Sequence, residues 1–233
     1  MAGILYLIPV TLGGNDYKQV IPEKVINLTR SLRHFIVEDL RSARRYLRLV
    51  DRVFPIDESV FFELNEHTRD SEINAILDPV IKGSDIGLMS EAGLPGIADP
   101  GSRLIENAHR KNIRVVPLSG PSSIIMALIS SGMNGQNFVF HGYLPVKPEE
   151  RNNKLREIEK NSQRGETQIF METPYRNQKM IEAILSICHP YTKLCIAADI
   201  TLPAEFIKIR KVSDWKKNIP VLNDRFVIFL IGS

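Results

Sequence analysis

The stretch that decides the fold of this 233-residue chain is Leu88-Met89-Ser90-Glu91-Ala92-Gly93-Leu94-Pro95-Gly96-Ile97-Ala98-Asp99-Pro100-Gly101. It follows an apolar run, residues 85–89, that predicts a strand, and it precedes a helix-like stretch, residues 102–111. Its three glycines and two prolines favour a loop of defined shape over a regular element. In open α/β sheets, ligands bind in loops at the carboxyl ends of strands. A tight strand-to-helix turn without a ligand has a similar composition, so both interpretations stay open.

Continuous apolar runs recur along the chain on both sides of this loop. In the first half they predict strands at residues 4–8, 34–37, 85–89 and 113–117, with helical periodicity between them. This alternation is typical of a mostly parallel sheet with helices on both faces. In the second half we expect strands at residues 167–171, 194–198, 205–211 and 225–231. The last of them follow one another closely, which favours a mixed, partly antiparallel sheet. We therefore predict an α/β protein with domains at 1–118 and 119–233.

Composition excludes several classes of protein. Apolar residues make up 43% of the chain, which is ample for a packed core, and the net charge of +3 is too small to indicate a nucleic-acid partner. Two cysteines, Cys188 and Cys195, are too few for a disulfide scaffold and are expected to be reduced. The sequence has no signal-peptide pattern and no run near the ~18 apolar residues of a membrane span. We expect a soluble, cytoplasmic protein.

Five arginines share one face of a predicted helix after the strand at residues 34–37. Leu40, Ala43, Leu47 and Val50 fall on the opposite face. The arginines are Arg41, Arg44, Arg45, Arg48 and Arg52. A solvated charged face is the ordinary explanation, but the stripe has no interleaved carboxylate and therefore also suits RNA phosphates.

The familiar catalytic motifs are missing. The sequence contains no Walker loop, GxGxxG fingerprint, catalytic-triad pattern, HExxH or cluster of metal ligands, so no metal is expected. A second Gly-Pro loop, residues 118–123, again follows a strand. Ser122 or Ser123 is positioned to cap the helix that follows, whose N-terminus could also hold an anion.

The loop at residues 90–101 resembles the Ser-Asp-Ala-Gly-Thr-Pro-Gly-Ile-Ser-Asp-Pro-Gly signature of the tetrapyrrole-methylase superfamily, the class III S-adenosylmethionine methyltransferases. It is most similar to the branch that methylates a cytidine ribose 2′-hydroxyl in small-subunit ribosomal RNA. Residues 118–123 resemble the family's Pro-Gly-Pro-Ser-Ala, residues 138–145 its Phe-x-Phe-x-Gly-Phe-Leu-Pro, and residues 172–176 its Glu-Ser-Pro-His-Arg. The resemblance extends from about residue 4 to about residue 206.

This resemblance implies a two-domain fold with S-adenosylmethionine in the cleft between the domains, RNA as the partner and a homodimer as the assembly. Carried over position by position, it implies a set of cofactor-binding residues. They are Pro9, Ser90, Glu91, Ala92, Gly93, Pro95, Gly96, Ile97, Asp99, Ser122, Ser123, Tyr143, Leu144, Glu172, Ala197 and Ala198.

A ribose hydroxyl is a weak nucleophile that a positioned base would activate. The candidate bases are Glu38, Asp39, Glu66 and Asp199, and we favour Asp39 and Asp199 as catalytic residues because both follow strands. The chain departs from the family pattern at several positions. Glu91 replaces an Asp, Tyr175 a His, Ala198 an Arg, Asp199 a Glu and Leu202 a Lys.

Two alternative functions remain. One is methylation of a small molecule such as a tetrapyrrole, although those relatives have Gly-Asp-Pro where this chain has Ser-Glu-Ala-Gly. The other is a non-catalytic RNA-binding or assembly protein that keeps the cofactor pocket. The departures from the family pattern favour the second alternative, and the intact loops argue against it.

Overall fold

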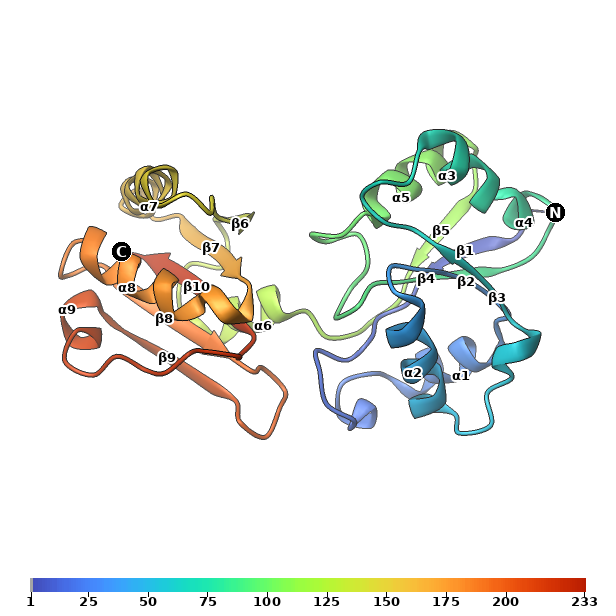
Figure 1. Ribbon diagram of the computed structural model, residues 1–233, viewed down its shortest axis with the longest axis horizontal. Helices are drawn as coiled ribbons and strands as arrows, with labels where there is room; N and C mark the ends of the chain where they lie inside the picture. Colours follow the sequence, from blue (N-terminus) through green and yellow to red (C-terminus); the bar gives the residue numbers. More distant parts are fainter. Residues whose placement is uncertain (1) are drawn as a thin grey trace. The chain divides into compact units, whose positions relative to one another are not determined.

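The computed structural model describes residues 2–233, which form two compact units that divide between Ser122 and Ser123 (Figure 1). No helix in this described part of the chain is long and apolar enough to cross a membrane.

The first unit contains a five-stranded sheet in which every neighbouring pair is parallel. Its strands, in the order β3-β2-β4-β1-β5, are β3 (Val60–Glu63), β2 (His34–Val37), β4 (Ile86–Met89), β1 (Ile4–Leu7) and β5 (Arg114–Pro117). All four residues of the central β4 are buried, as a strand covered on both faces requires. The predicted parallel sheet is confirmed.

Helices cover both faces of this sheet (Figure 1). On one face, α1 (Glu23–Ser31) and α2 (Leu40–Val50) bury side chains such as Ile26 and Leu47 in a cluster with Phe35. On the other face lie the helices α3 (Asp70–Ile76), α4 (Asp78–Ile81) and α5 (Gly101–Arg110).

Sequence reasoning missed two strands, β3 in this unit and residues 138–143 in the second unit, and merged two helices. The edge strand β3 has no fully buried residue, and its apolar run is only three residues long, Val60 to Phe62, before Glu63. The helical periodicity of residues 72–81 predicts a single helix, but the structure divides this stretch into α3 and α4. Pro79 explains the division, because proline has no N–H to continue the hydrogen-bond ladder of a helix.

The second unit contains a mixed sheet, as predicted. Its strands, in the order β6-β7-β10-β8-β9, are β6 (Phe138–Tyr143), β7 (Thr167–Glu172), β10 (Val227–Gly232), β8 (Lys193–Ala198) and β9 (Phe206–Lys211). β6 and β7 run parallel, while β7 with β10, β10 with β8 and β8 with β9 are antiparallel.

The core of the second unit lies between this sheet and three helices. They are α7 (Pro148–Ser162), α8 (Asn177–Ile187) and α9 (Val212–Trp215). Phe170 and Phe229 stack with ring centroids 5.6 Å apart, and the buried Trp215 donates its indole N–H to the carbonyl of Leu194 at 2.9 Å. A fourth helix, α6 (Ser123–Ser131), packs against β8, β9 and β10, and its buried residues are outside this cluster.

Candidate functional site

Three loops meet at the carboxyl-terminal edge of the first sheet. They follow β1, β4 and β5, and direct contacts join them. The N–H of Val10 donates to the carbonyl of Gly93 at 2.9 Å, which links the first loop to the second. Gly120 packs against Pro9 so closely that a Cβ added there would lie 2.1 Å from the Pro9 Cβ. The edge is therefore a single packed surface built from distant parts of the sequence.

The loop after β4 owes its shape to one carboxylate. Asp99 accepts hydrogen bonds from the N–H of Gly96, at 3.0 and 2.8 Å to its two oxygens, and from the N–H of Gly101 at 2.8 Å. Gly93 and Gly96 have φ of +71° and +89°, which glycine adopts without the steric strain of a side chain. Burial raises the pKa of Asp99, and the hydrogen bonds from Gly101 and Gly96 act in the opposite direction.

This loop exposes three apolar side chains and one carboxylate at the edge of the sheet. Gly93 and Pro95 are buried, whereas Glu91, Ala92, Ile97 and Ala98 are exposed. The hydroxyl of Ser90 donates to the carbonyl of Ala92 at 3.2 Å. The predicted residues of the first two loops, from Pro9 to Asp99, are thus brought together within the first unit.

Two neighbouring acidic residues after β2 have different environments. Asp39 is the N-cap of α2 and accepts from the N–H of Ser42 at 2.7 Å, and hydrogen bonds from Ser42 lower its pKa. Burial raises the pKa of Glu38, and the charges of Glu91 and Asp99 raise it further. Glu38 lines a small hollow together with Ser90 and Asp99. Glu38 therefore faces the loop, while the carboxylate of Asp39 is engaged by its own helix.

The arginine stripe of α2 is exposed, and its opposite face is buried at Ala43, Leu47 and Val50, as predicted. The structure divides the stripe between two hollows. Arg41 and Arg44 line one of them, of about 600 Å³, with Asp39 and Glu91. The other three arginines line a larger one, of about 990 Å³.

The predicted residues of the second unit gather at one edge of the second sheet. Tyr143 pairs with Met171 in the β6–β7 ladder, and Val227 pairs with both Glu172 and Ala198. The side chains of Leu144 and Ala198 belong to the hydrophobic core, so only their main chain is available to a ligand.

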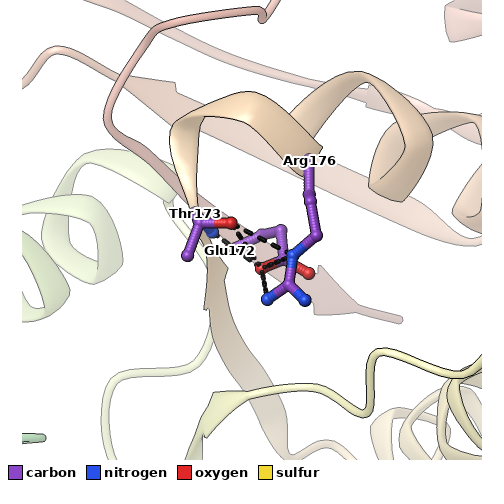
Figure 2. Close-up of polar contacts among 3 residues, drawn as sticks. All are labelled: Glu172, Thr173 and Arg176. Atoms are coloured by element: carbon purple, nitrogen blue, oxygen red, sulfur yellow. Dashed lines mark hydrogen bonds and ion pairs between the residues drawn. The ribbon is translucent and has the colours of Figure 1, made fainter.

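Glu172 is held by its own turn, as Figure 2 shows. Its side chain is 2% exposed. Its Oε1 accepts from the N–H of Thr173 at 2.7 Å and from Nε and Nη2 of Arg176 at 2.9 and 2.5 Å. The Arg176 guanidinium also lies over the exposed ring of Tyr175, with its Cζ 5.7 Å from the ring centroid. This carboxylate fixes the turn at the end of β7.

Asp199 has a partner that sequence reasoning missed. Its Oδ2 accepts from Nε of Arg225 at 2.6 Å, and its Oδ1 accepts from the N–H of Phe226 at 3.0 Å. Arg225 lies 26 residues further along the chain, and no local pattern marks it as a partner. Glu66 pairs with its neighbour His67, at 3.5 Å, and both side chains are more than four-fifths exposed.

The chain matches the model of one protein family, described as Tetrapyrrole (Corrin/Porphyrin) Methylases, over residues 5–215. It is 32% identical over 207 residues to the ribosomal RNA small subunit methyltransferase I of Vibrio cholerae serotype O1, covering 89% of this chain and 68% of that protein. It is 29% identical to the Bacillus subtilis protein of the same name, covering 99% of this chain and 76% of that protein.

The same fold occurs in a solved structure. The crystal structure of the methyltransferase CobJ aligns with a TM-score of 0.64 and 17% sequence identity, covering 100% of this chain and 95% of that chain. At this level of identity the likeness concerns the fold alone.

Proposed function

The chain belongs to the Tetrapyrrole (Corrin/Porphyrin) Methylases, and from that membership we propose that it methylates a ribose 2′-hydroxyl of small-subunit ribosomal RNA. The enzyme class follows from the family: it is an S-adenosylmethionine-dependent methyltransferase. What we propose beyond this class is the methyl acceptor, a ribose of small-subunit ribosomal RNA. It is supported by relatives named for the small ribosomal subunit and by the Ser-Glu-Ala-Gly loop at residues 90–93.

The loop after β4 fits the cofactor. Its bends at Gly93 and Gly96 bring main chain to the carboxyl-terminal edge of the sheet, where open α/β sheets bind ligands. In the described residues, the N–H groups of Ile97 and Ala98 donate no hydrogen bond and are available to a polar ligand. We propose that this loop and the neighbouring Pro9 and Ser122 hold S-adenosylmethionine. In the second unit, Ser123, Tyr143 and the main chain at Leu144, Ala197 and Ala198 stay candidates from the resemblance of the sequence to the family.

Bound S-adenosylmethionine supplies a methyl group that is already activated on a sulfonium. The residues of the chain therefore have to align the acceptor and remove its proton. With the cofactor bound, the residues of this site would hold the ribose hydroxyl toward the methyl group, and a base of the chain would take up the hydroxyl proton.

Glu38 is the base that this geometry favours. It lines a hollow with Ser90 and Asp99, and its raised pKa makes it a better proton acceptor than an ordinary carboxylate. Asp39 and Asp199 remain candidates from the sequence. Asp39 is bonded to Ser42, and Asp199 pairs with Arg225. Glu38 instead accepts a main-chain hydrogen bond from Glu91 and, among the residues that the structure describes, faces no cation. Glu172 is likewise held by Arg176, so we propose that it supports the cofactor site by fixing its turn.

The observation that carries this proposal is the loop tied by Asp99 at the edge of the sheet, beside Glu38. The test is calorimetric titration with S-adenosylmethionine and its demethylated product, followed by transfer of labelled methyl to small ribosomal subunits. Ribose methylation in the recovered RNA supports the proposal. Cofactor binding without transfer to any RNA would instead identify a non-catalytic binding protein, and transfer only to a tetrapyrrole would identify the small-molecule enzyme.

We also propose a homodimer in the cytoplasm, from membership of the family and from ribosomal RNA as the acceptor. Light scattering coupled to gel filtration measures the mass, and a value near 26.4 kDa at micromolar concentration would contradict the dimer.

A further inference from the structure

A groove in the first unit has two chemically distinct walls. One wall is the exposed face of α2, and the other is the loop after β1. Together they enclose about 990 Å³. Tyr46 joins the two walls: this buried side chain of α2 donates its hydroxyl to the carbonyl of Pro9 at 3.1 Å. Because this contact anchors the helix to the loop, the two walls of the groove are held in a fixed arrangement.

The helix wall carries unpaired positive charge. Arg45, Arg48 and Arg52 line it, and in the described residues none of them lies within 4 Å of a carboxylate. Arg45 and Arg48 lie about 4.5 Å apart along the axis of α2, and Arg52 follows two residues after the helix ends at Val50. Two of the lining arginines also donate to main-chain carbonyls: Nη1 of Arg48 to Arg52 at 2.9 Å and Nε of Arg30 to Val50 at 3.1 Å. Asp51 adds one carboxylate to the lining.

The loop wall offers a cation and main-chain donors. Lys18 and the half-buried ring of Tyr17 line it, next to Gly13 and Gly14. These glycines have φ of +131° and +62°, and their N–H groups donate no hydrogen bond in the part of the chain that the structure describes. Unpaired N–H groups in such a turn are suited to an anion.

The groove leads to the candidate cofactor loop. Ser90 and Glu91, the first two residues after β4, also line this groove, whereas Arg41 and Arg44 line a separate hollow. A chain of phosphates lying along Arg45, Arg48 and Arg52 would therefore reach the loop where methyl transfer is proposed.

We propose that this groove binds the backbone of a single RNA strand beside the nucleotide that is methylated, an inference that rests on the proposed function. Arg45, Arg48, Arg52 and Lys18 contact successive phosphates, and Tyr17 stacks on a base. One line of arginines opposite one loop fits one strand, whereas a duplex is contacted through shape across its wide minor groove. The proposal thus selects three of the five arginines in the stripe and adds two residues that the sequence did not indicate.

The test compares two variants with the same change in charge. The groove variant is Arg45→Glu, Arg48→Glu and Arg52→Glu, and the control is Lys82→Glu, Lys111→Glu and Arg114→Glu. The control residues are exposed, and they lie after α4, after α5 and at the start of β5. Fluorescence anisotropy measures binding of a labelled single-stranded oligoribonucleotide over a range of salt concentrations. Circular dichroism and calorimetry with S-adenosylmethionine establish that each variant is folded and binds cofactor.

We expect the groove variant to bind the strand at least about tenfold more weakly than the control. The slope of log affinity against log salt should fall in magnitude by about 2, since each lost phosphate contact removes ~0.7. Lys18→Glu changes the other wall and leaves α2 intact, and it should also weaken binding of the RNA strand. Equal affinity and slope in groove and control variants would overturn the inference, as would tighter binding of duplex RNA by the unmodified protein.

The outcomes separate this inference from the proposed function. If the unmodified protein methylates RNA and the groove variant does so as well as the control, the groove proposal fails and the function stands. If the groove variant loses RNA binding but the unmodified protein methylates no ribose, the groove stands and the proposed function fails.

Discussion

The carboxylate of Asp99 accepts hydrogen bonds from the main-chain N–H of Gly96, at 3.0 and 2.8 Å to its two oxygens. A third bond, from the N–H of Gly101 at 2.8 Å, ties the same carboxylate to the start of α5. One side chain thus fixes both the bend of the cofactor loop and its connection to the following helix.

Replacing Asp99 with Ala should loosen this loop. Hydrogen bonds to a charged group contribute about 2 kcal/mol, so we expect a loss of that order in unfolding free energy and a fall in affinity for S-adenosylmethionine. Asp99→Asn keeps one acceptor oxygen and should have a smaller effect. Urea unfolding and calorimetry measure both quantities, with the exposed Asp57→Asn as control. Unchanged cofactor affinity in Asp99→Ala would show that the loop does not hold the cofactor.

Gly96→Val should abolish cofactor binding. A β-branched residue is strained at φ +89°, and its Cβ would lie 2.9 Å from the Cδ1 of Ile105. Gly132 is the matched control, because it has a similar φ of +68° but nothing within 4 Å of an added Cβ. Gly132→Val should lower the unfolding temperature through the same backbone strain. Its affinity for S-adenosylmethionine, measured by calorimetry, should not change. Equal affinities in the two variants would contradict the assignment.

Glu38→Gln should lower the rate of methyl transfer by about 10²-fold or more, as the loss of a general base does, while cofactor affinity is retained. The ionised carboxylate is the active form, so the raised pKa of Glu38 places the acidic limb of the pH–rate profile above the ordinary carboxylate range. Glu91→Gln removes a negative charge that raises this pKa, and the limb should then move to lower pH. An acidic limb that stays in place in Glu91→Gln would argue against Glu38 as the titrating group.

Arg176→Ala should destabilise the protein by about 3 kcal/mol or more, because it leaves the carboxylate of Glu172 buried without its cation. Adding Glu172→Gln should restore part of that loss, since the remaining group is then neutral. Chemical denaturation of the two single variants and the double variant measures the coupling. If the loss of unfolding free energy in the double variant equals the sum of the losses in the two single variants, the ion pair does not stabilise the turn.

Both thiols should resist reagents in the native state. Cys188 and Cys195 are free and buried, and burial raises the pKa of each to about 12. Because the thiolate is the reactive form, a chromogenic disulfide should react only after unfolding in denaturant. Rapid reaction of either thiol in the folded protein would show that its segment opens locally.

Local patterns in the sequence were enough to predict several helices and strands correctly. The continuous apolar run at residues 34–37 predicts β2 with the bounds that the structure has. The spacing of Ala43, Leu47 and Val50 predicts the buried face of α2, and a proline start followed by a polar helical pattern predicts α7 at Pro148–Ser162. Periodicity suffices there because it depends only on neighbouring residues.

Only the tertiary structure decided which charges meet. Glu38 and Asp39 are adjacent in the sequence, yet one faces Glu91 and Asp99 across the sheet edge and the other caps its own helix. Asp199 meets Arg225 from 26 residues away. The sequence by itself determined most of the strands and helices and the glycine loop, because these follow from local conformational preference and hydrophobic periodicity. The partners of the buried carboxylates depend on how distant segments pack, and packing is a property of the folded chain as a whole.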